Sequence, residues 1–202
     1  MPKTFVISDT HFNHELILSF KDYIGKPVRN FDSVEQMNEC MMDNWVSVVK
    51  PEDTIIHLGD VLFGENKVDW LEANFAKLPG KKHLILGNHD NPKFLAPFFK
   101  SIKLWTELPG MVLSHAPMHE QTLNESHRFK DGILNVHGHI HTNACPPGPY
   151  KCVSVEQINF TPLDVEEINV GWLEDTKRTC TRSRYSWPYW LGSTEYIRRW
   201  SV

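Results

Sequence analysis

The chain has 202 residues, of which 41% are hydrophobic and 23% charged, and these ordinary globular values exclude a fibrous or disordered protein. The formal net charge of −4 gives no overall basic field for holding nucleic acid, and no apolar stretch approaches the ~18 residues of a membrane span. The first residues lack the basic and long apolar segments of a signal peptide. We therefore expect a cytoplasmic globular protein with no membrane partner.

Short apolar segments, each followed by a polar cluster, predict buried β-strands. In chain order they cover residues 4–7, 54–58, 83–86, 111–113 and 133–137. Because patterns typical of helices fall between them, the chain is expected to have an α/β fold.

The first predicted helix begins after a capping residue, Asp32 or Ser33, and presents apolar residues at helical spacing. A second helix is predicted over residues 67–77 and a short one over residues 165–170. Residues 119–131 are mostly polar, and we expect no regular structure there.

Each predicted strand is followed by side chains that can bind a metal ion. Functional sites in open α/β sheets form at the carboxyl ends of the strands, so these side chains should converge. They are Asp9, His11, Asp60, Asn88, His89, His115, His139 and His141. Imidazole nitrogens combined with carboxylate and amide oxygens suit two divalent ions. No cysteine belongs to this set of side chains, which disfavours a thiolate zinc site. Asp60 could bridge two such ions, which together can hold a phosphate group.

Five short blocks resemble, in their order along the chain, the motifs of the calcineurin-like metallophosphoesterases, in particular small stand-alone bacterial and phage members. The blocks are Asp9-Thr10-His11, Gly59-Asp60, Gly87-Asn88-His89-Asp90, His115 and Gly138-His139-Ile140-His141. One such block alone is weakly specific, but five ordered blocks over roughly residues 5–162 are very hard to obtain by chance. The resemblance implies two mixed β-sheets packed as a sandwich and flanked by helices.

The resemblance also implies a role for each motif residue. One ion would be held by Asp9, His11, Asp60 and His141, and the other by Asp60, Asn88, His115 and His139. Manganese is the favoured metal, with iron, zinc, nickel or cobalt as alternatives. His89 would protonate the leaving group, and Asp90 would orient its loop or the His89 ring, so we assign both to the catalytic set.

The substrate contacts are expected to come from Asn88, His89 and His14. His14 lies shortly after the first motif, and for this residue we weigh contact with the substrate phosphate evenly against a surface position. His57 and His137 lie inside strand patterns and are expected to be structural.

The family pattern implies a metal-dependent phosphohydrolase in which a hydroxide activated by two ions attacks a phosphomonoester or phosphodiester. The chain is too short for the capping domain of the family's double-strand-break nucleases, and it lacks the extended second motif of its protein phosphatases. A small nucleotide or cyclic nucleotide is therefore the expected substrate. The alternatives are a phosphoesterase or nuclease that processes nucleic-acid ends and a non-catalytic scaffold, which the intact motifs disfavour.

The composition changes after Gly171, which separates an expected metallophosphoesterase domain, residues 1–171, from an extension, residues 172–202. The extension has four of the seven tryptophans, and six basic against three acidic residues. Because large exposed apolar surfaces usually mark interfaces, we expect it to pack on the domain or on a partner subunit of a homo-oligomer. Aromatic and arginine side chains also suit single-stranded nucleic acid, a partner that we consider but do not favour.

Overall fold

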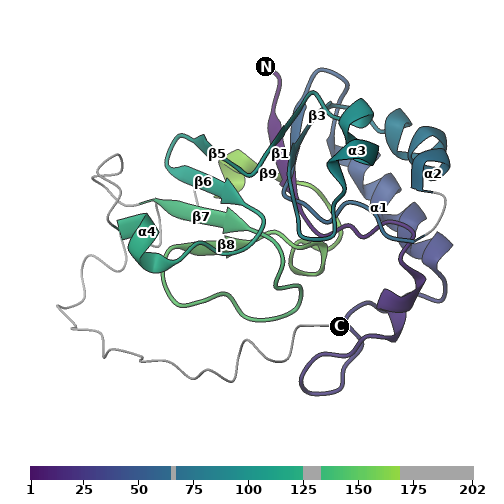
Figure 1. The fold of residues 1–202 in the computed structure, drawn as a ribbon, viewed down its shortest axis with the longest axis horizontal. Helices are drawn as coiled ribbons and strands as arrows, with labels where there is room; N and C mark the ends of the chain where they lie inside the picture. The colour runs from purple at the N-terminus through teal and green to yellow at the C-terminus, as the bar shows by residue number, and fades with distance from the viewer. Residues whose placement is uncertain (65–66, 125–132, 169–202) are drawn as a thin grey trace.

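Two mixed β-sheets pack face to face, and helices lie on their outer sides (Figure 1). The computed structural model describes residues 1–64, 67–124 and 133–168, so the predicted extension lies outside the described residues. The first sheet has the order β4 (Ser101–Lys103), β3 (Lys81–Ile85), β2 (Thr54–His57), β1 (Thr4–Ile7) and β9 (Leu163–Asp164). The second has the order β5 (Trp105–Leu108), β6 (Met111–Ser114), β7 (Leu134–His137) and β8 (Tyr150–Cys152). The predicted sandwich is confirmed.

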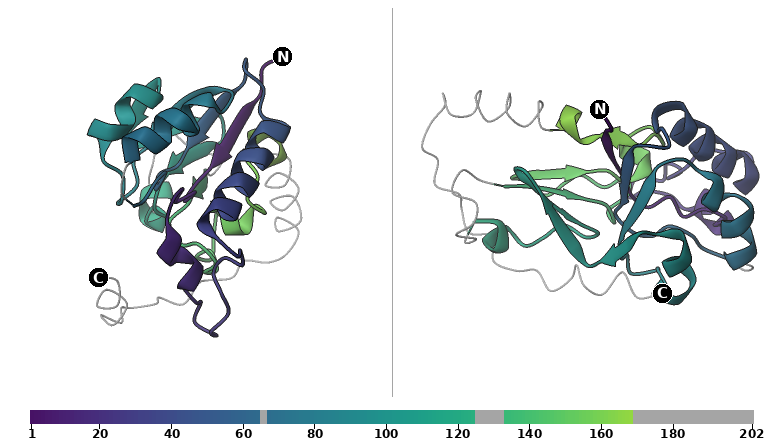
Figure 2. Two further views of the ribbon diagram at one scale, coloured as in Figure 1. Left: turned by 90° about the vertical axis from the view of Figure 1, so that its right-hand side faces the viewer. Right: turned by 90° about the horizontal axis from the view of Figure 1, so that it is seen from above.

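The layers follow from the alternation of apolar side chains along the strands. In β1, Val6 packs between the sheets, whereas Phe5 and Ile7 belong to the core beneath the helices α1 (Val34–Val48) and α2 (Lys67–Ala73). Figure 2 shows these helices on the side of the first sheet that faces away from the second. In β6, Val112 packs outward against a third cluster that includes Leu123 of α4 (Glu120–Asn124).

The helix α1 begins where the capping pattern predicted. The Ser33 hydroxyl accepts a hydrogen bond from the Gln36 backbone N–H at 3.2 Å, which satisfies one of the free donors at the helix start. Met37, Met41 and Trp45 are buried along one face. The indole N–H of Trp45 donates to the carbonyl of Pro79 at 2.9 Å and ties the helix to the turn before β3.

The other predicted helices form with changed limits. Residues 67–77 form α2 and a separate 3₁₀ turn, η2 (Phe75–Lys77), with Asn74 between them. Residues 165–168 are helical, and the rest of that prediction lies outside the described residues. Short helices that no pattern predicted are η1 (Glu15–Ser19), α3 (Pro92–Leu95), η3 (Ala96–Phe98) and η4 (Val155–Gln157).

The prediction of no regular structure over residues 119–131 is wrong in its first part. Residues Glu120–Asn124 form the helix α4, while residues 125–131 lie outside the described residues. Leu123 is only 4% exposed and packs with Val112 and Ile133. The packing of this one apolar side chain holds the otherwise polar helix α4 on the second sheet. Packing here outweighs the local pattern.

The parallel strands end level with one another, which places the loops that follow them side by side. In the first sheet Ile7 is opposite His57, and His57 is opposite Leu84. The two sheets meet at this end: the Ser8 N–H donates to the carbonyl of Val153 at 3.0 Å, and the Val155 N–H donates to the carbonyl of Ser8 at 3.1 Å. The carboxyl ends of the parallel strands of both sheets therefore lie at one edge of the molecule.

Among the helices in the described part of the chain, none has the length and apolar character needed to cross a bilayer.

Trp45→Ala is expected to lower the free energy of unfolding by about 3–5 kcal/mol, because the indole is fully buried and hydrogen-bonded. For a chain of this size the melting temperature should fall by roughly 10 °C. Val46→Ala is a matched control, since Val46 lies on the same helix and is 58% exposed. Thermal unfolding followed by circular dichroism measures both, and equal melting temperatures for the two variants would contradict the packing described.

Candidate metal site

Seven predicted ligands come together at the carboxyl ends of the strands. Asp9, His11 and His141 form a first cluster, and Asp60, His115 and His139 form a second one; within each cluster the candidate ligand atoms lie within 4.8 Å of one another. The seventh, Asn88, places Oδ1 2.9 Å from Nε2 of His115 and so extends the second cluster. The residues come from loops after β1, β2, β3, β6 and β7.

Asp60 lies between the two clusters. Its Oδ2 is 3.5 Å from Nε2 of His11 and 3.5 Å from Nε2 of His115. Its Oδ1 accepts a hydrogen bond from the backbone N–H of His89 at 3.0 Å, which fixes the carboxylate plane. One oxygen of Asp60 therefore faces a ligand atom of each cluster.

Buried polar atoms of the first cluster have no hydrogen-bond partner among the described residues. They are Oδ1 of Asp9 and both ring nitrogens of His11. An unsatisfied buried polar atom costs about 1–3 kcal/mol, so a fold that gathers three of them needs a compensating partner. A divalent cation supplies one for the oxygen and for the ring nitrogen that faces Asp60.

Lone pairs face each other in the second cluster. Nδ1 of His115 lies 2.8 Å from the carbonyl oxygen of Leu58 and therefore carries the hydrogen, which leaves Nε2 of the neutral ring as an acceptor. That Nε2 is 2.9 Å from the Asn88 side-chain oxygen and 3.1 Å from Nδ1 of His139. A cation among these atoms turns repulsion into coordination, so the donor set fits a divalent metal.

The backbone at five of the seven predicted ligands is left-handed. The φ angles are 56° at Asp9, 45° at His11, 57° at Asp60, 70° at His139 and 49° at His141. Non-glycine residues in this region cost on the order of 1–3 kcal/mol each and persist where the surrounding structure fixes them, often at functional sites. These turns let two ligands separated by one residue lie at the same edge of the sheet.

Two glycines allow the loops to approach the ligands closely. A Cβ atom on Gly87 would lie 2.1 Å from Oδ1 of Asp60. A Cβ atom on Gly138 would lie 1.9 Å from Oγ of Ser8 and 2.2 Å from Oδ2 of Asp9. Any larger residue would displace the Asp60 or Asp9 carboxylate, which accounts for these glycines in the motifs.

Asp90 contacts backbone amides. Its carboxylate accepts hydrogen bonds from the N–H groups of Asp60, Val61 and Gly87, each at 2.9 Å. The contact joins the loop after β2 to the loop after β3. The bond from Gly87 lies within the loop of Asp90 itself, as expected for the first of the two roles considered for it, and the other two bonds hold the loop that carries Asp60.

The rings of His89 and His14 lie beside His11 of the first cluster. The His89 side chain is exposed, and its ring centroid lies 5.7 Å from that of His11. His14 is only 8% exposed and stacks on Phe63 at a centroid distance of 4.1 Å, so the surface position considered for it is wrong. Burial, followed by the charge of Arg29, lowers the pKa of His14 to about 4.

The sequence analysis missed a buried ionic contact behind the first cluster. Nε of Arg29 donates to Oε1 of Glu156 at 2.8 Å, and Nδ1 of His141 lies 2.9 Å from the same oxygen. Although burial raises the pKa of Glu156, the charge of Arg29 and the hydrogen bond from His141 lower it to about 2. Because 126 residues separate Arg29 and Glu156 in the chain, no local motif could have revealed the pair.

Two further polar side chains support the same loop. The Ser154 hydroxyl donates to Oδ2 of Asp9 at 2.9 Å, and Nε2 of His57 lies 3.0 Å from the Thr10 hydroxyl oxygen. Burial lowers the pKa of His57 to about 3, so its ring is neutral. His57 and His137 are both buried, as expected.

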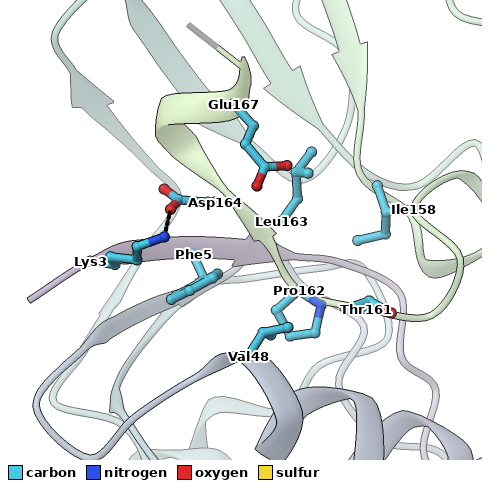
Figure 3. Close-up of a pocket in the computed structure, with 9 residues that line it drawn as sticks. All are labelled: Lys3, Phe5, Val48, Ile158, Thr161, Pro162, Leu163, Asp164 and Glu167. Atoms are coloured by element: carbon cyan, nitrogen blue, oxygen red, sulfur yellow. Dashed lines mark ion pairs between the residues drawn. The ribbon is translucent and has the colours of Figure 1, made fainter. Parts of the chain in front are cut away.

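A cavity of about 350 Å³ lies elsewhere, beside the amino end of β1 and the strand β9 (Figure 3). Lys3 and Asp164 form an ion pair of 2.8 Å at its edge. Because the two clusters lie at the carboxyl ends of the strands, this cavity at the amino end of β1 is separate from the candidate metal site.

Comparison with known proteins points to one family. The model of the family described as calcineurin-like phosphoesterase matches residues 2–197. An uncharacterized protein of Methanocaldococcus jannaschii is 34% identical over 177 residues, covering 83% of this chain and 90% of that protein. The Gene 66 protein of Mycobacterium phage L5 is 28% identical over 174 residues, covering 70% of this chain and 79% of that protein.

A solved structure has a similar fold. The crystal structure of a protein of unknown function from Aquifex aeolicus aligns with a TM-score of 0.65 at 30% sequence identity. The alignment covers 84% of this chain and 98% of that one.

Gly138→Ala is expected to weaken divalent-metal binding by about 10–100-fold, the range typical when the support of a ligand is lost. The new methyl group would displace the Asp9 carboxylate. Gly25→Ala is the control for a strained backbone without a clash: φ at Gly25 is 82°, but a Cβ atom there meets nothing within 4 Å and displaces no carboxylate. Isothermal titration with Mn²⁺ measures both variants, and unchanged binding in Gly138→Ala would show that Asp9 is not a ligand.

Proposed function

Because the chain belongs to the calcineurin-like phosphoesterase family, we propose that it is a binuclear, metal-dependent phosphohydrolase acting on a small nucleotide or cyclic nucleotide. The family and the clusters of aspartate and histidine support hydrolysis of a phosphate ester with a divalent metal. The two-ion centre and the nucleotide substrate are the parts that we infer from the geometry.

The position of Asp60 carries the two-ion proposal. One of its oxygens is equally distant, at 3.5 Å, from a histidine nitrogen of each cluster. Asp9, His11 and His141 would complete the first site, and Asn88, His115 and His139 the second. We expect manganese, because the donors are nitrogen and oxygen without thiolate. When bound, two divalent ions would polarise the phosphate and lower the pKa of the water that attacks phosphorus.

His89 is placed to help the leaving group depart. Its backbone N–H is held by Asp60, while its exposed ring lies outside both clusters. A ring in this position can donate a proton to the leaving-group oxygen and can contact the substrate phosphate. Asp90 supports this arrangement by accepting hydrogen bonds from the backbone of Gly87, before His89, and of Asp60 and Val61.

A series of aromatic rings extends from the clusters and supports a substrate with a planar base. His14 stacks on Phe63, and the Phe20 ring lies edge-on to His14 at a centroid distance of 5.7 Å. Phe20 is 48% exposed, so its ring is open to a ligand. Nζ of Lys67 lies 5.3 Å from the centroid of Phe63 and adds a positive charge at this edge. Aromatic faces bind bases by stacking, and lysine binds phosphate as a point charge.

Protein stripped of metal and reloaded with Mn²⁺, Fe²⁺, Zn²⁺, Ni²⁺ or Co²⁺ should hydrolyse nucleoside monophosphates or cyclic nucleotides faster than glycerol phosphate. Phe20→Ala, which removes the ring open to a ligand, should lower kcat/KM for nucleotides and leave that for glycerol phosphate unchanged. Chromatography of the products and a phosphate assay measure both. No metal-dependent hydrolysis of any phosphate ester would refute the activity, and equal rates for nucleotides and glycerol phosphate would refute the substrate assignment.

His89→Asn is expected to lower kcat for a nucleotide by about 10²–10⁴-fold, because a general acid contributes that much. The loss should shrink for p-nitrophenyl phosphate, whose leaving group needs little protonation. Elemental analysis should show nearly the same metal content as in the wild type. Equal losses for both substrates would instead indicate that His89 only positions the phosphate.

A further inference from the structure

We propose that Arg29 and Glu156 are positioning residues for the first cluster, which they prepare to bind its ion, and that they act on the second cluster much less. The proposal rests on the proposed function, since it takes the two clusters as metal sites. It assigns a role to a pair of buried charges that touches neither a ligand atom of the second cluster nor the approach to the site.

Arg29 holds the loop that carries the first ligands. Its side chain is fully buried, and its Nη1 donates to the carbonyl of Thr10 at 2.7 Å, while Nη2 donates to the carbonyl of Asp9. These carbonyls belong to the left-handed turn that contains Asp9 and His11. A planar guanidinium with five donors in a fixed arrangement can hold two carbonyls and a carboxylate at once.

Glu156 transfers this anchoring to the third ligand. Its Oε1 accepts the hydrogen bond from Nε of Arg29 and lies 2.9 Å from Nδ1 of His141. Because a carboxylate oxygen can only accept, Nδ1 of His141 carries the hydrogen, and Nε2 is left as the ligand atom. That Nε2 lies 3.9 Å from Oδ1 of Asp9, the buried oxygen without a hydrogen-bond partner among the described residues. The pair therefore fixes which ring nitrogen of His141 is free to bind the first ion, and it holds the loop that carries Asp9 and His11.

The second cluster is fixed by other groups. The His115 ring is held by the carbonyl of Leu58, and the Asp60 loop is held by Asp90. None of these contacts involves Arg29 or Glu156. The loop that Arg29 holds reaches the second cluster through two hydrogen bonds, from the His139 N–H to Oδ2 of Asp9 at 2.8 Å and from the His11 N–H to the carbonyl of Asp60 at 3.0 Å. Loss of the pair should therefore affect the two metal sites unequally.

Metal stoichiometry and affinity can test this without relying on activity. In Mn²⁺ titrations followed by electron paramagnetic resonance of the free ion, the wild type should bind two ions per chain. Arg29→Met and Glu156→Gln should each weaken one site by about 10–100-fold, the usual cost of losing the support of a ligand, and change the affinity of the other site by a much smaller factor. Lys3→Met, which removes the ion pair with Asp164 near the opposite end of β1, is the control and should bind both ions normally.

The double variant Arg29→Met/Glu156→Gln separates positioning from charge balance. A single variant leaves one buried group without its partner and can lower stability, whereas the double variant removes both charges and should regain stability. Circular dichroism of the metal-free proteins checks folding. The proposal expects the first site to remain weak in the double variant, and recovery of its affinity would overturn it. Two wild-type sites in all variants would also overturn it, whereas a wild type that binds no ion would refute the proposed function itself.

Discussion

The candidate site depends on the backbone junction between β1 and β8. The strand β1 ends at Ile7. The backbone of the next residue, Ser8, forms hydrogen bonds with Val153 and Val155 in the segment that follows β8 of the second sheet. Without this pairing the two sheets could slide over their shared apolar layer, because hydrophobic contact has no direction. Hydrogen bonds have direction, so they fix the strand ends against each other. Asp9, which follows at once, then meets Ser154 and His139 from the other sheet.

The gathering of ligands could be predicted from short stretches of chain, and the same short motifs carried the family resemblance that implied the sandwich. A buried strand followed by a polar turn is a local pattern, and the ligands sit directly after such strands. Gly138 is an example. A side chain there would clash with Ser8 and Asp9, which are distant in sequence, but the glycine precedes the ligand His139 directly and is therefore part of a readable motif. A motif is readable when the chemistry and the backbone that supports it are neighbours in sequence.

The parts that could not be predicted depend on distant contacts. Glu156 lies in the turn η4, and nothing around it distinguishes this carboxylate from exposed ones until Arg29 packs against it. The helix α4 forms in a polar stretch because Leu123 finds an apolar neighbour across the sheet. His14 gave no clear signal either, since its burial depends on Phe63 from the loop after β2. In each case the deciding partner comes from another part of the chain.

The left-handed turns at Asp9, His11, Asp60, His139 and His141 couple metal binding to folding. In the unfolded chain these residues rarely adopt the left-handed conformation, and the ligands lie far apart. The unfolded chain therefore has low affinity for an ion. The native state alone presents the complete donor set, and an ion that binds only this state stabilises it by mass action. At a free metal concentration one hundred times the Kd, one such site adds about 2.7 kcal/mol to the free energy of unfolding. The free concentration of metal thereby becomes one determinant of the free energy of unfolding of this protein.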